Sequence, residues 1–215
     1  MFDCCVMCVA RNSEDYLDLC IRTVAPYVSS VKLTVDSRST DDTWQIAVKL
    51  MKDFKNVQAT VFKIENPKKD LVAMRNSQLS FDEEWGFIVD SDEFHFDIEN
   101  YHLGGQDAYA FQCYAVWNEI RAHRSSSKAR IGRIFRNYGK LEWKGKWGKE
   151  TLYRNNLPVF RNPLLLPHKY IHFTHVKKDK WRKEMHQERI ADDKYLFTMP
   201  DHIIRLVRET YAKAV

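Results

Sequence analysis

The first ninety residues alternate apolar runs with amphipathic stretches, and this alternation constrains the fold more than any other feature of the chain. Predicted strands span 3–10, 31–35, 57–64 and 87–89, and helical spacing follows Ser13 and recurs at about 42–54 and 70–79, with Ser13 and Asp70 as expected caps. Strands separated by helices of this length favour βαβ crossovers, which join parallel strands. The sequence therefore predicts an α/β fold with a mostly parallel central sheet flanked by helices.

Charged side chains directly follow three of the predicted strands. Arg11 follows the first strand, Asp36 ends the second, and Asp90 ends the fourth. The carboxyl ends of parallel strands meet at one edge of a sheet, which is where open α/β folds bind ligands. We therefore expect these three side chains to converge although they are far apart in the sequence.

The run from Trp85 to Glu93 is the most informative of these strand ends. An apolar stretch meets three carboxylates within four residues there, those of Asp90, Asp92 and Glu93. Carboxylates crowded in this way repel one another unless a cation lies among them. Mg²⁺ commonly takes one or two carboxylates together with substrate phosphates. The run indicates either a metal–diphosphate site or an acidic turn after a core strand.

The second half of the chain has a mixed pattern. Strands are predicted at 108–117, 130–135 and 164–174, a basic loop at 121–128, and helices at 180–196 and 201–214. The 215 residues contain no internal repeat and no low-complexity linker, and their number suits one domain. We therefore expect a single domain over 1–215, with a mixed second half.

Composition and charge indicate the compartment of the protein and the kinds of partner that it could bind. No apolar stretch approaches the ~20 residues of a transmembrane helix, and the N-terminus has no basic region ahead of an apolar run. Five cysteines without zinc-site spacing favour a reducing, cytoplasmic compartment. The net charge of +5 is modest, and basic clusters at 128–149 and 177–183 suit an anionic ligand, a peripheral membrane contact or a solvated face. A nucleic-acid partner is not expected, because the acidic run would repel a phosphate backbone.

Four sequence blocks lie at predicted strand ends or helix starts. They are V-M-C-V-A-R-N at 6–12, V-K-L-T-V-D-S-R-S-T-D-D-T at 31–43, A-M-R-N at 73–76 and W-G-F-I-V-D-S-D-E at 85–93. In this order they resemble the family 2 glycosyltransferases of the GT-A fold, whose D-x-x-S-x-D-x-T pattern is matched by Asp36, Ser39, Asp41 and Thr43. Later, R-I-F-R-N and W-K-G-K-W-G-K-E resemble a region of bacterial core-sugar transferases.

The resemblance implies a single GT-A-type domain that moves a sugar from a nucleotide-diphosphate donor, a UDP-sugar above all. The acceptor would be a glycan or another hydroxyl compound, the transfer would be inverting, and Mn²⁺ or Mg²⁺ would act as the Lewis acid. Residues 1–96 would then form the nucleotide-sugar-binding half, and 97–215 the half that completes the acceptor and metal sites.

The resemblance also implies roles for particular residues. Asp36 would accept a hydrogen bond from uracil, and Arg11 and Arg75 would lie near the base or phosphates. Asp90 would lie nearest the ribose and the metal, and Asp92 would ligate the metal directly. The implied nucleotide-sugar-binding set is Arg11, Asp36, Arg75, Asp90 and Ser91.

The catalytic base and a further metal ligand come from less clear resemblances. Glu150 is the candidate base, although Lys149 stands where similar enzymes carry a histidine, and Glu93 or Asp92 are alternatives. Many GT-A enzymes place a late histidine on the metal, for which His172 and His175 are the candidates. Because these two would point to opposite faces of a strand, at most one of them is expected to ligate.

Two other functions are compatible with the same nucleotide-binding half. A sugar nucleotidyltransferase would share it, but such enzymes carry a glycine-rich phosphate loop where this chain has Arg11-Asn12-Ser13. A catalytically inactive module that binds a nucleotide sugar or a glycan is the other alternative.

Overall fold

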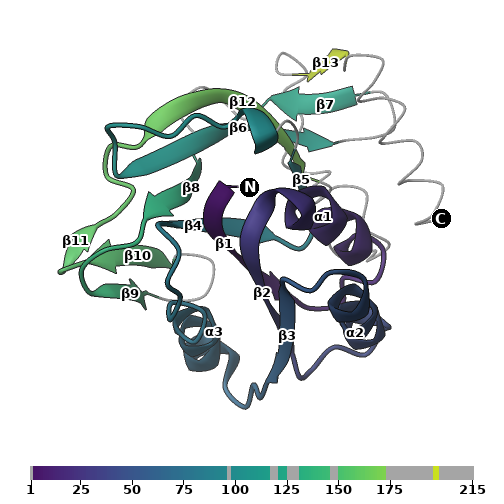
Figure 1. The fold of residues 1–215 in the computed structure, drawn as a ribbon. Coiled ribbons are helices and arrows are strands. Elements are labelled where there is room, and N and C mark those ends of the chain that lie inside the picture. The colour runs from purple at the N-terminus through teal and green to yellow at the C-terminus, as the bar shows by residue number, and fades with distance from the viewer. Residues whose placement is uncertain are drawn as a thin grey trace.

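A computed structural model describes residues 2–95, 98–116, 121–124, 131–145, 150–172 and 196–198 of the chain (Figure 1). One large sheet runs through these residues in the strand order β13-β7-β6-β8-β4-β1-β2-β3, and a smaller sheet has the order β11-β10-β9. Helices lie against the large sheet (Figure 1). The predicted α/β class, with a parallel first half and a mixed second half, is confirmed.

The first half of the chain builds the parallel part of the large sheet. Its strands are β1 (Phe2–Ala10), β2 (Val28–Asp36), β3 (Val57–Phe62) and β4 (Trp85–Asp90). Its helices are α1 (Leu17–Val24), α2 (Thr43–Asp53) and α3 (Pro67–Asn76), with a 3-10 turn, η1 (Ala25–Tyr27), after α1. β1 pairs in parallel with β2 and β4, and its register sets Ala10 beside Val35 and Val9 beside Asp90. The three strands therefore end at one edge of the sheet.

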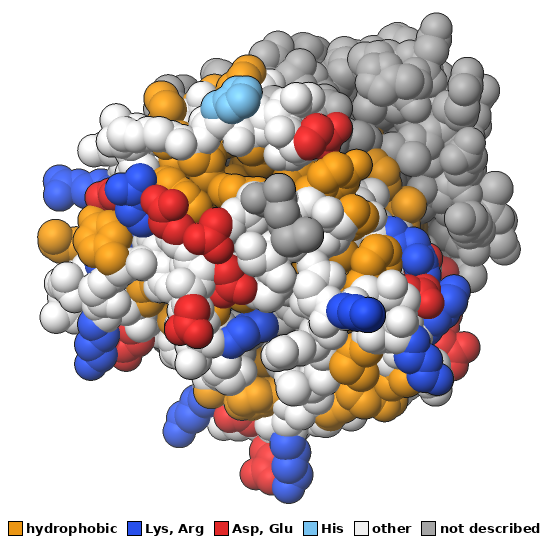
Figure 2. Space-filling model, in the orientation of Figure 1, with side chains coloured by type: hydrophobic (Ala, Val, Ile, Leu, Met, Phe, Trp, Pro, Cys, Tyr) orange, Lys and Arg blue, Asp and Glu red, His pale blue; other side chains and the backbone are white. Residues whose placement is uncertain are grey.

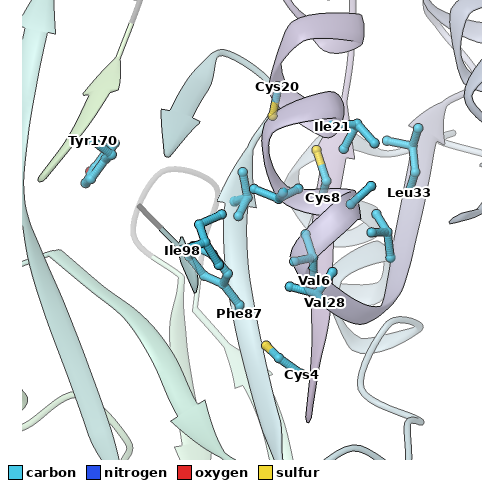
Figure 3. Packing of buried hydrophobic residues seen from close by; sticks show 14 of the residues in the cluster. Cys4, Val6, Cys8, Cys20, Ile21, Val28, Leu33, Phe87, Ile98 and Tyr170 are labelled. Atoms are coloured by element: carbon cyan, nitrogen blue, oxygen red, sulfur yellow. The ribbon is translucent and has the colours of Figure 1, made fainter. Parts of the chain in front are cut away.

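Strand β1 is buried on both faces, as is typical of a parallel sheet. Its residues in the core cluster shared with α1 and α2 are Cys4, Val6, Cys8 and Ala10, and its residues in the cluster shared with α3 are Cys5 and Met7. Figure 3 shows Cys8 with Cys20 and Ile21 of α1 around it. This two-sided packing fixes where the loops after β1, β2 and β4 emerge.

Both expected helix caps differ from the structure. Helix α1 begins at Leu17, and the side chain of Ser13 instead hydrogen-bonds elsewhere, as described below. Helix α3 begins at Pro67, a residue that suits a first helical position because it needs no N–H partner there. Asp70 lies inside the first turn, where its carboxylate accepts the backbone N–H groups of Glu65 and Asn66 at 2.8 and 2.6 Å.

The second half of the chain extends the sheet with mixed pairing. It contains β5 (Glu93–His95), a 3-10 turn η2 (Ile98–Asn100), β6 (Ala108–Val116), β7 (Arg121–Arg124), β8 (Ile131–Arg136), β12 (Leu164–His172) and β13 (Leu196–Thr198). β8 pairs antiparallel with β4 and β6, and β12 pairs parallel with β6 and antiparallel with β5. These pairings bring residues from the second half of the chain beside the end of β4.

Three predicted strands of the second half match β6, β8 and β12, and one predicted loop is wrong. Residues 121–124 of the expected loop form β7, because they pair with β6 and β13. The helices predicted at 180–196 and 201–214 lie outside the described residues, apart from Leu196, which begins β13.

The small sheet is attached to helix α3. It is antiparallel and consists of β9 (Leu141–Lys144), β10 (Thr151–Arg154) and β11 (Leu157–Pro158). The Asn76 carboxamide donates to the Trp143 carbonyl at 3.1 Å and accepts from the Trp143 N–H at 2.7 Å, as a neighbouring strand would. Figure 1 shows the small sheet beside α3. Glu150 directly precedes β10, so this attachment also anchors the chain near the candidate base.

The face seen in Figure 2 carries charges of both signs. Lys and Arg are interspersed with Asp and Glu over the described residues of this face, with hydrophobic side chains between them. Within the described ranges, no helix combines the length and the apolar character needed to cross a membrane.

Candidate functional site

A cavity of about 580 Å³ lies at the carboxyl edge of β1, β2 and β4. Its lining comes from these strand ends and from α3. The lining residues are Val9, Arg11, Asp36, Arg38, Pro67, Leu71, Met74, Arg75, Asp90, Ser91 and Asp92. The whole predicted nucleotide-sugar-binding set is therefore brought together, and the guanidinium groups of three arginines share one cavity with three carboxylates.

Hydrogen bonds between the loops that follow β1 and β2 hold this edge of the sheet. Three consecutive backbone N–H groups of the first loop donate to side chains of the second loop and of Thr43, which begins α2. The pairs are Asn12 with Ser39 at 3.4 Å, Ser13 with Thr43 at 2.7 Å and Glu14 with Asp41 at 3.1 Å. The Ser, Asp and Thr of the D-x-x-S-x-D-x-T pattern therefore fix the loop that carries Arg11.

The hydroxyl of Ser91 connects a third loop to the same assembly. It shares a hydrogen bond of 2.7 Å with the Ser13 hydroxyl, which also donates to the Arg11 carbonyl at 3.1 Å. Both serine side chains are buried. The loops after β1, β2 and β4 are thus joined to one another, and Arg11 and Ser91 of these loops line the cavity.

Asp36 is held by an arginine that the sequence did not single out. Arg38 donates its backbone N–H and Nε to Oδ1 at 2.9 and 3.0 Å, and Nη2 to Oδ2 at 2.5 Å. Burial alone would raise the pKa of Asp36, but the hydrogen bonds and charge of Arg38, with Arg11 Nε at 3.9 Å, lower it below the ordinary value. The only sequence signal for Arg38 was its position two residues after Asp36, inside the same loop.

Asp90 lies between two arginines. Arg75 Nη2 approaches Oδ1 at 3.5 Å from the cavity side, and Arg133 Nη2 approaches Oδ2 at 2.9 Å from β8. Burial alone would raise the pKa of Asp90, but Arg133 and Arg75 together lower it to about 2. The Arg75 guanidinium also lies over the Trp143 ring, 5.2 Å from its centroid. Asp90 is therefore a carboxylate whose charge and orientation are both fixed.

Asp92 and His172 form the pair that could receive a metal ion. His172 Nε2 lies 3.3 Å from Asp92 Oδ1, and β12 brings the histidine there by pairing with β5. Burial alone would lower the pKa of His172, but Asp92 raises it well above the ordinary value. Carboxylate and neutral imidazole are both acceptable Mn²⁺ ligands, so an ion bound here would displace the proton that Asp92 stabilises on His172. Within the described ranges no group of three or more His, Cys, Asp and Glu residues could hold an ion, so phosphate oxygens of a ligand would have to complete the set.

Glu93 does not line the cavity. Its side chain is fully buried, forms an ion pair with Arg133, accepts the Asp90 N–H at 3.1 Å and lies 3.4 Å from His95 Nε2. A general base must reach the hydroxyl that it deprotonates. The placement of Glu93 therefore favours a role as a support for the loop after β4, and its candidacy as the base stays a prediction.

Glu150 and His175 are the two remaining candidate residues. Glu150 is half-buried beside β10 and is not among the residues that line the cavity. His175 and Lys149 lie outside the described residues.

Arg133 is a site residue that the sequence analysis placed only in a predicted strand. It contacts both Asp90 and Glu93, and it was missed because these contacts depend on strand pairing.

The chain resembles solved structures only at low similarity. S. aureus TarS 1–349 matches with 21% identity and a TM-score of 0.45, over 64% of this chain and 47% of that one. A mannosyltransferase from Pyrobaculum calidifontis, in complex with GDP-Man and Mn²⁺, matches with 14% identity and a TM-score of 0.41, over 62% and 44%. Glucosyl-3-phosphoglycerate synthase from Mycobacterium tuberculosis, in complex with Mn²⁺, UDP and glucosyl-3-phosphoglycerate, matches with 17% identity and a TM-score of 0.37, over 53% and 44%. The chain thus spans less than half the length of each. No protein-family model and no curated protein matches it.

Proposed function

We propose that this chain is a metal-dependent glycosyltransferase that uses a nucleotide-diphosphate sugar, with a UDP-sugar as the first candidate donor. The observation that carries the proposal is the cavity at the carboxyl edge of β1, β2 and β4, where Arg11, Arg38 and Arg75 stand among three carboxylates. Guanidinium groups bind phosphate oxygens through paired, charge-assisted hydrogen bonds, and carboxylates accept hydrogen bonds from ribose hydroxyls. A nucleoside diphosphate carries both phosphate oxygens and ribose hydroxyls in one molecule, so it can contact the arginines and the carboxylates together.

The residues would divide the work as follows. Asp36, held by Arg38, would contact the base, and Asp90, held between Arg75 and Arg133, would accept the ribose hydroxyls. Asp92 and His172 would hold the cation, which supplies Lewis-acid stabilisation of the diphosphate when bound. Residues 1–96 would thus bind the donor, and 97–215 would complete the metal and acceptor sites.

The transfer itself would be a direct displacement. The acceptor hydroxyl oxygen forms a bond to the anomeric carbon while the bond from that carbon to the diphosphate oxygen breaks, and the nucleoside diphosphate leaves with the electron pair. The hydroxyl proton passes to a carboxylate, for which Glu150 is our candidate. The Glu93 carboxylate is fully buried and ion-paired with Arg133, whereas Glu150 is only half-buried. A displacement of this kind inverts the anomeric configuration.

The loop after β1 favours this function over sugar nucleotidyl transfer. A phosphate-binding loop offers free backbone N–H groups to its ligand. Here the N–H groups of Asn12, Ser13 and Glu14 are all bonded to side chains of the neighbouring loop. These three groups are therefore occupied before any ligand arrives.

The test is a thermal-shift screen of UDP- and GDP-sugars with and without Mn²⁺, followed by assays of transfer and hydrolysis. Since a ligand stabilises the folded state according to its affinity, a donor that raises Tm only with Mn²⁺ supports the proposal. Asp92→Asn should abolish that metal-dependent rise, whereas the control Asp82→Asn, an exposed carboxylate before β4, should keep it. A full Mn²⁺-dependent shift in Asp92→Asn would refute the assignment of Asp92. Donor binding without turnover would favour an inactive binding module.

A further inference from the structure

Arg133 is a buried guanidinium behind the candidate site. It belongs to β8, whose antiparallel pairing with β4 continues from Trp85↔Arg136 to Phe87↔Ile134. Its side chain is 9% exposed and is not part of the cavity lining. A charge in such a place is costly unless it is paired, so its partners indicate what it does.

Among the described residues, its Nη2 atom contacts the two ends of the acidic loop after β4 and one residue of β12. That atom donates to Asp90 Oδ2 at 2.9 Å, to Glu93 Oε1, and to the Tyr170 hydroxyl at 3.4 Å. The guanidinium also lies over the Tyr170 ring, 5.4 Å from its centroid. Arg133 is therefore clamped by β12 on one side and bonded to two carboxylates on the other.

The charged residues around Arg133 form two pairs of opposite charge, Arg133 with Glu93 and Arg75 with Asp90. Glu93 is enclosed by Arg133, by the Asp90 N–H and by His95, so its charge is matched by Arg133. Asp90 keeps its second oxygen, Oδ1, toward Arg75 and the cavity. One oxygen of Asp90 is thus held from behind, and the other is presented to a ligand.

We propose that Arg133 is a positioning residue that reserves Asp90 for hydrogen bonds with the nucleotide and leaves Asp92, with His172, as the metal-facing pair. The inference rests on the proposed function, which it deepens. Two adjacent carboxylates would otherwise both turn toward a cation, because each gains from approaching it. With Oδ2 bonded to Arg133, Asp90 cannot present both oxygens to the cavity.

The proposal predicts different effects on the affinities for UDP and for Mn²⁺, whereas a general loss of structure would weaken both. Arg133→Met removes a positive charge behind the site and releases Asp90. The affinity for UDP at saturating Mn²⁺ should fall by roughly 10- to 100-fold, if a carboxylate that binds a nucleotide depends on its supporting residue as much as one that binds a metal does. The affinity for Mn²⁺ alone should stay equal or become tighter. Isothermal titration of the whole chain measures both, and Arg136→Met, on the same strand and paired with exposed Glu84, is the matched control that should change neither.

A second variant keeps the test valid where Arg133→Met does not fold, since that change leaves Glu93 buried without its partner. Arg133→Met combined with Glu93→Gln removes both charges together. The double variant should unfold at a higher temperature than Arg133→Met and should still bind UDP weakly. UDP affinity restored to that of the unchanged chain would overturn the proposal, because Arg133 would then serve only to neutralise Glu93. Equal weakening of UDP and Mn²⁺ in a folded variant would overturn it too.

A crystal structure of the double variant separates this inference from the proposed function. Failure of the unchanged chain to bind UDP with Mn²⁺ would refute the proposed function alone. The position of Asp90 then still decides the inference: displacement of its carboxylate from Arg75 supports it, and a carboxylate that stays in place overturns it.

Discussion

Thr43 offers the sharpest test of how the loops beneath the cavity are held. Its side chain is fully buried, its hydroxyl oxygen accepts the Ser13 N–H at 2.7 Å, and the same hydroxyl donates to Asp41 Oδ1 at 2.5 Å. Thr43→Val keeps the shape of the side chain and removes the hydroxyl. Thr43→Ser keeps the hydroxyl and removes only the methyl group, so the two variants separate hydrogen bonding from packing.

The expected free energies follow from these contacts. In Thr43→Val the buried Ser13 N–H loses its partner, which costs about 1–3 kcal/mol. In Thr43→Ser the loss is one buried methyl group, about 0.8 kcal/mol. For a chain of this size 1 kcal/mol corresponds to roughly 2–4 °C in Tm. A central cost of about 2 kcal/mol for Thr43→Val therefore predicts a Tm lower by roughly 4–8 °C, against roughly 1.6–3.2 °C for Thr43→Ser.

Urea unfolding measures the two free energies, and hydrogen exchange at the Ser13 amide reports the bond directly. That amide should exchange faster in Thr43→Val than in Thr43→Ser, since only the former opens the bond. If Thr43→Val is as stable as the unchanged chain while Thr43→Ser is not, the methyl group rather than the hydroxyl holds the loops, and the reasoning fails.

Three further outcomes are expected. Gly86→Ala would set a Cβ 2.8 Å from Cε1 and Cε2 of Phe135, so it should lower the free energy of unfolding in urea by about 1–3 kcal/mol. The control Gly104→Ala, whose Cβ meets nothing within 4 Å, should be close to neutral, and equal stabilities of the two variants would contradict the packing. Asn76→Leu should cost about 2 kcal/mol, because it removes both hydrogen bonds to Trp143, and unchanged stability would show that the small sheet docks without them. The pKa of Asp36 is below its ordinary value, so its carboxylate stabilises the fold above about pH 4, and this stabilisation is lost as the pH falls through the lowered pKa. Asp36→Asn should therefore be less stable than the unchanged chain at pH 6, with the difference shrinking toward pH 3; a difference that does not depend on pH would exclude this ionisation as the cause.

The parallel half of the fold could be read from the sequence because its signals are local. Apolar runs of strand length, helical spacing between them and the βαβ rule suffice to predict β1, β2 and β4 as parallel strands and to place Arg11, Asp36 and Asp90 at one edge. Cap positions were less accurate. Ser13 and Asp70 were expected as caps from residue type. Helix α1 instead begins at Leu17, and the Ser13 side chain hydrogen-bonds to Ser91. Helix α3 begins at Pro67, three residues before Asp70.

The sequence by itself determined the class of fold and the acidic run that meets the cavity, because these depend on the order of residues along one strand and its loop. Only the tertiary structure decided what each acidic residue faces. Antiparallel pairing of β8 with β4 set Arg133 behind Asp90 and sealed Glu93, and pairing of β12 with β5 brought His172 to Asp92. Such contacts join residues about 40 to 80 positions apart. They depend on which strands pair, and these pairings join segments that are far apart in the sequence.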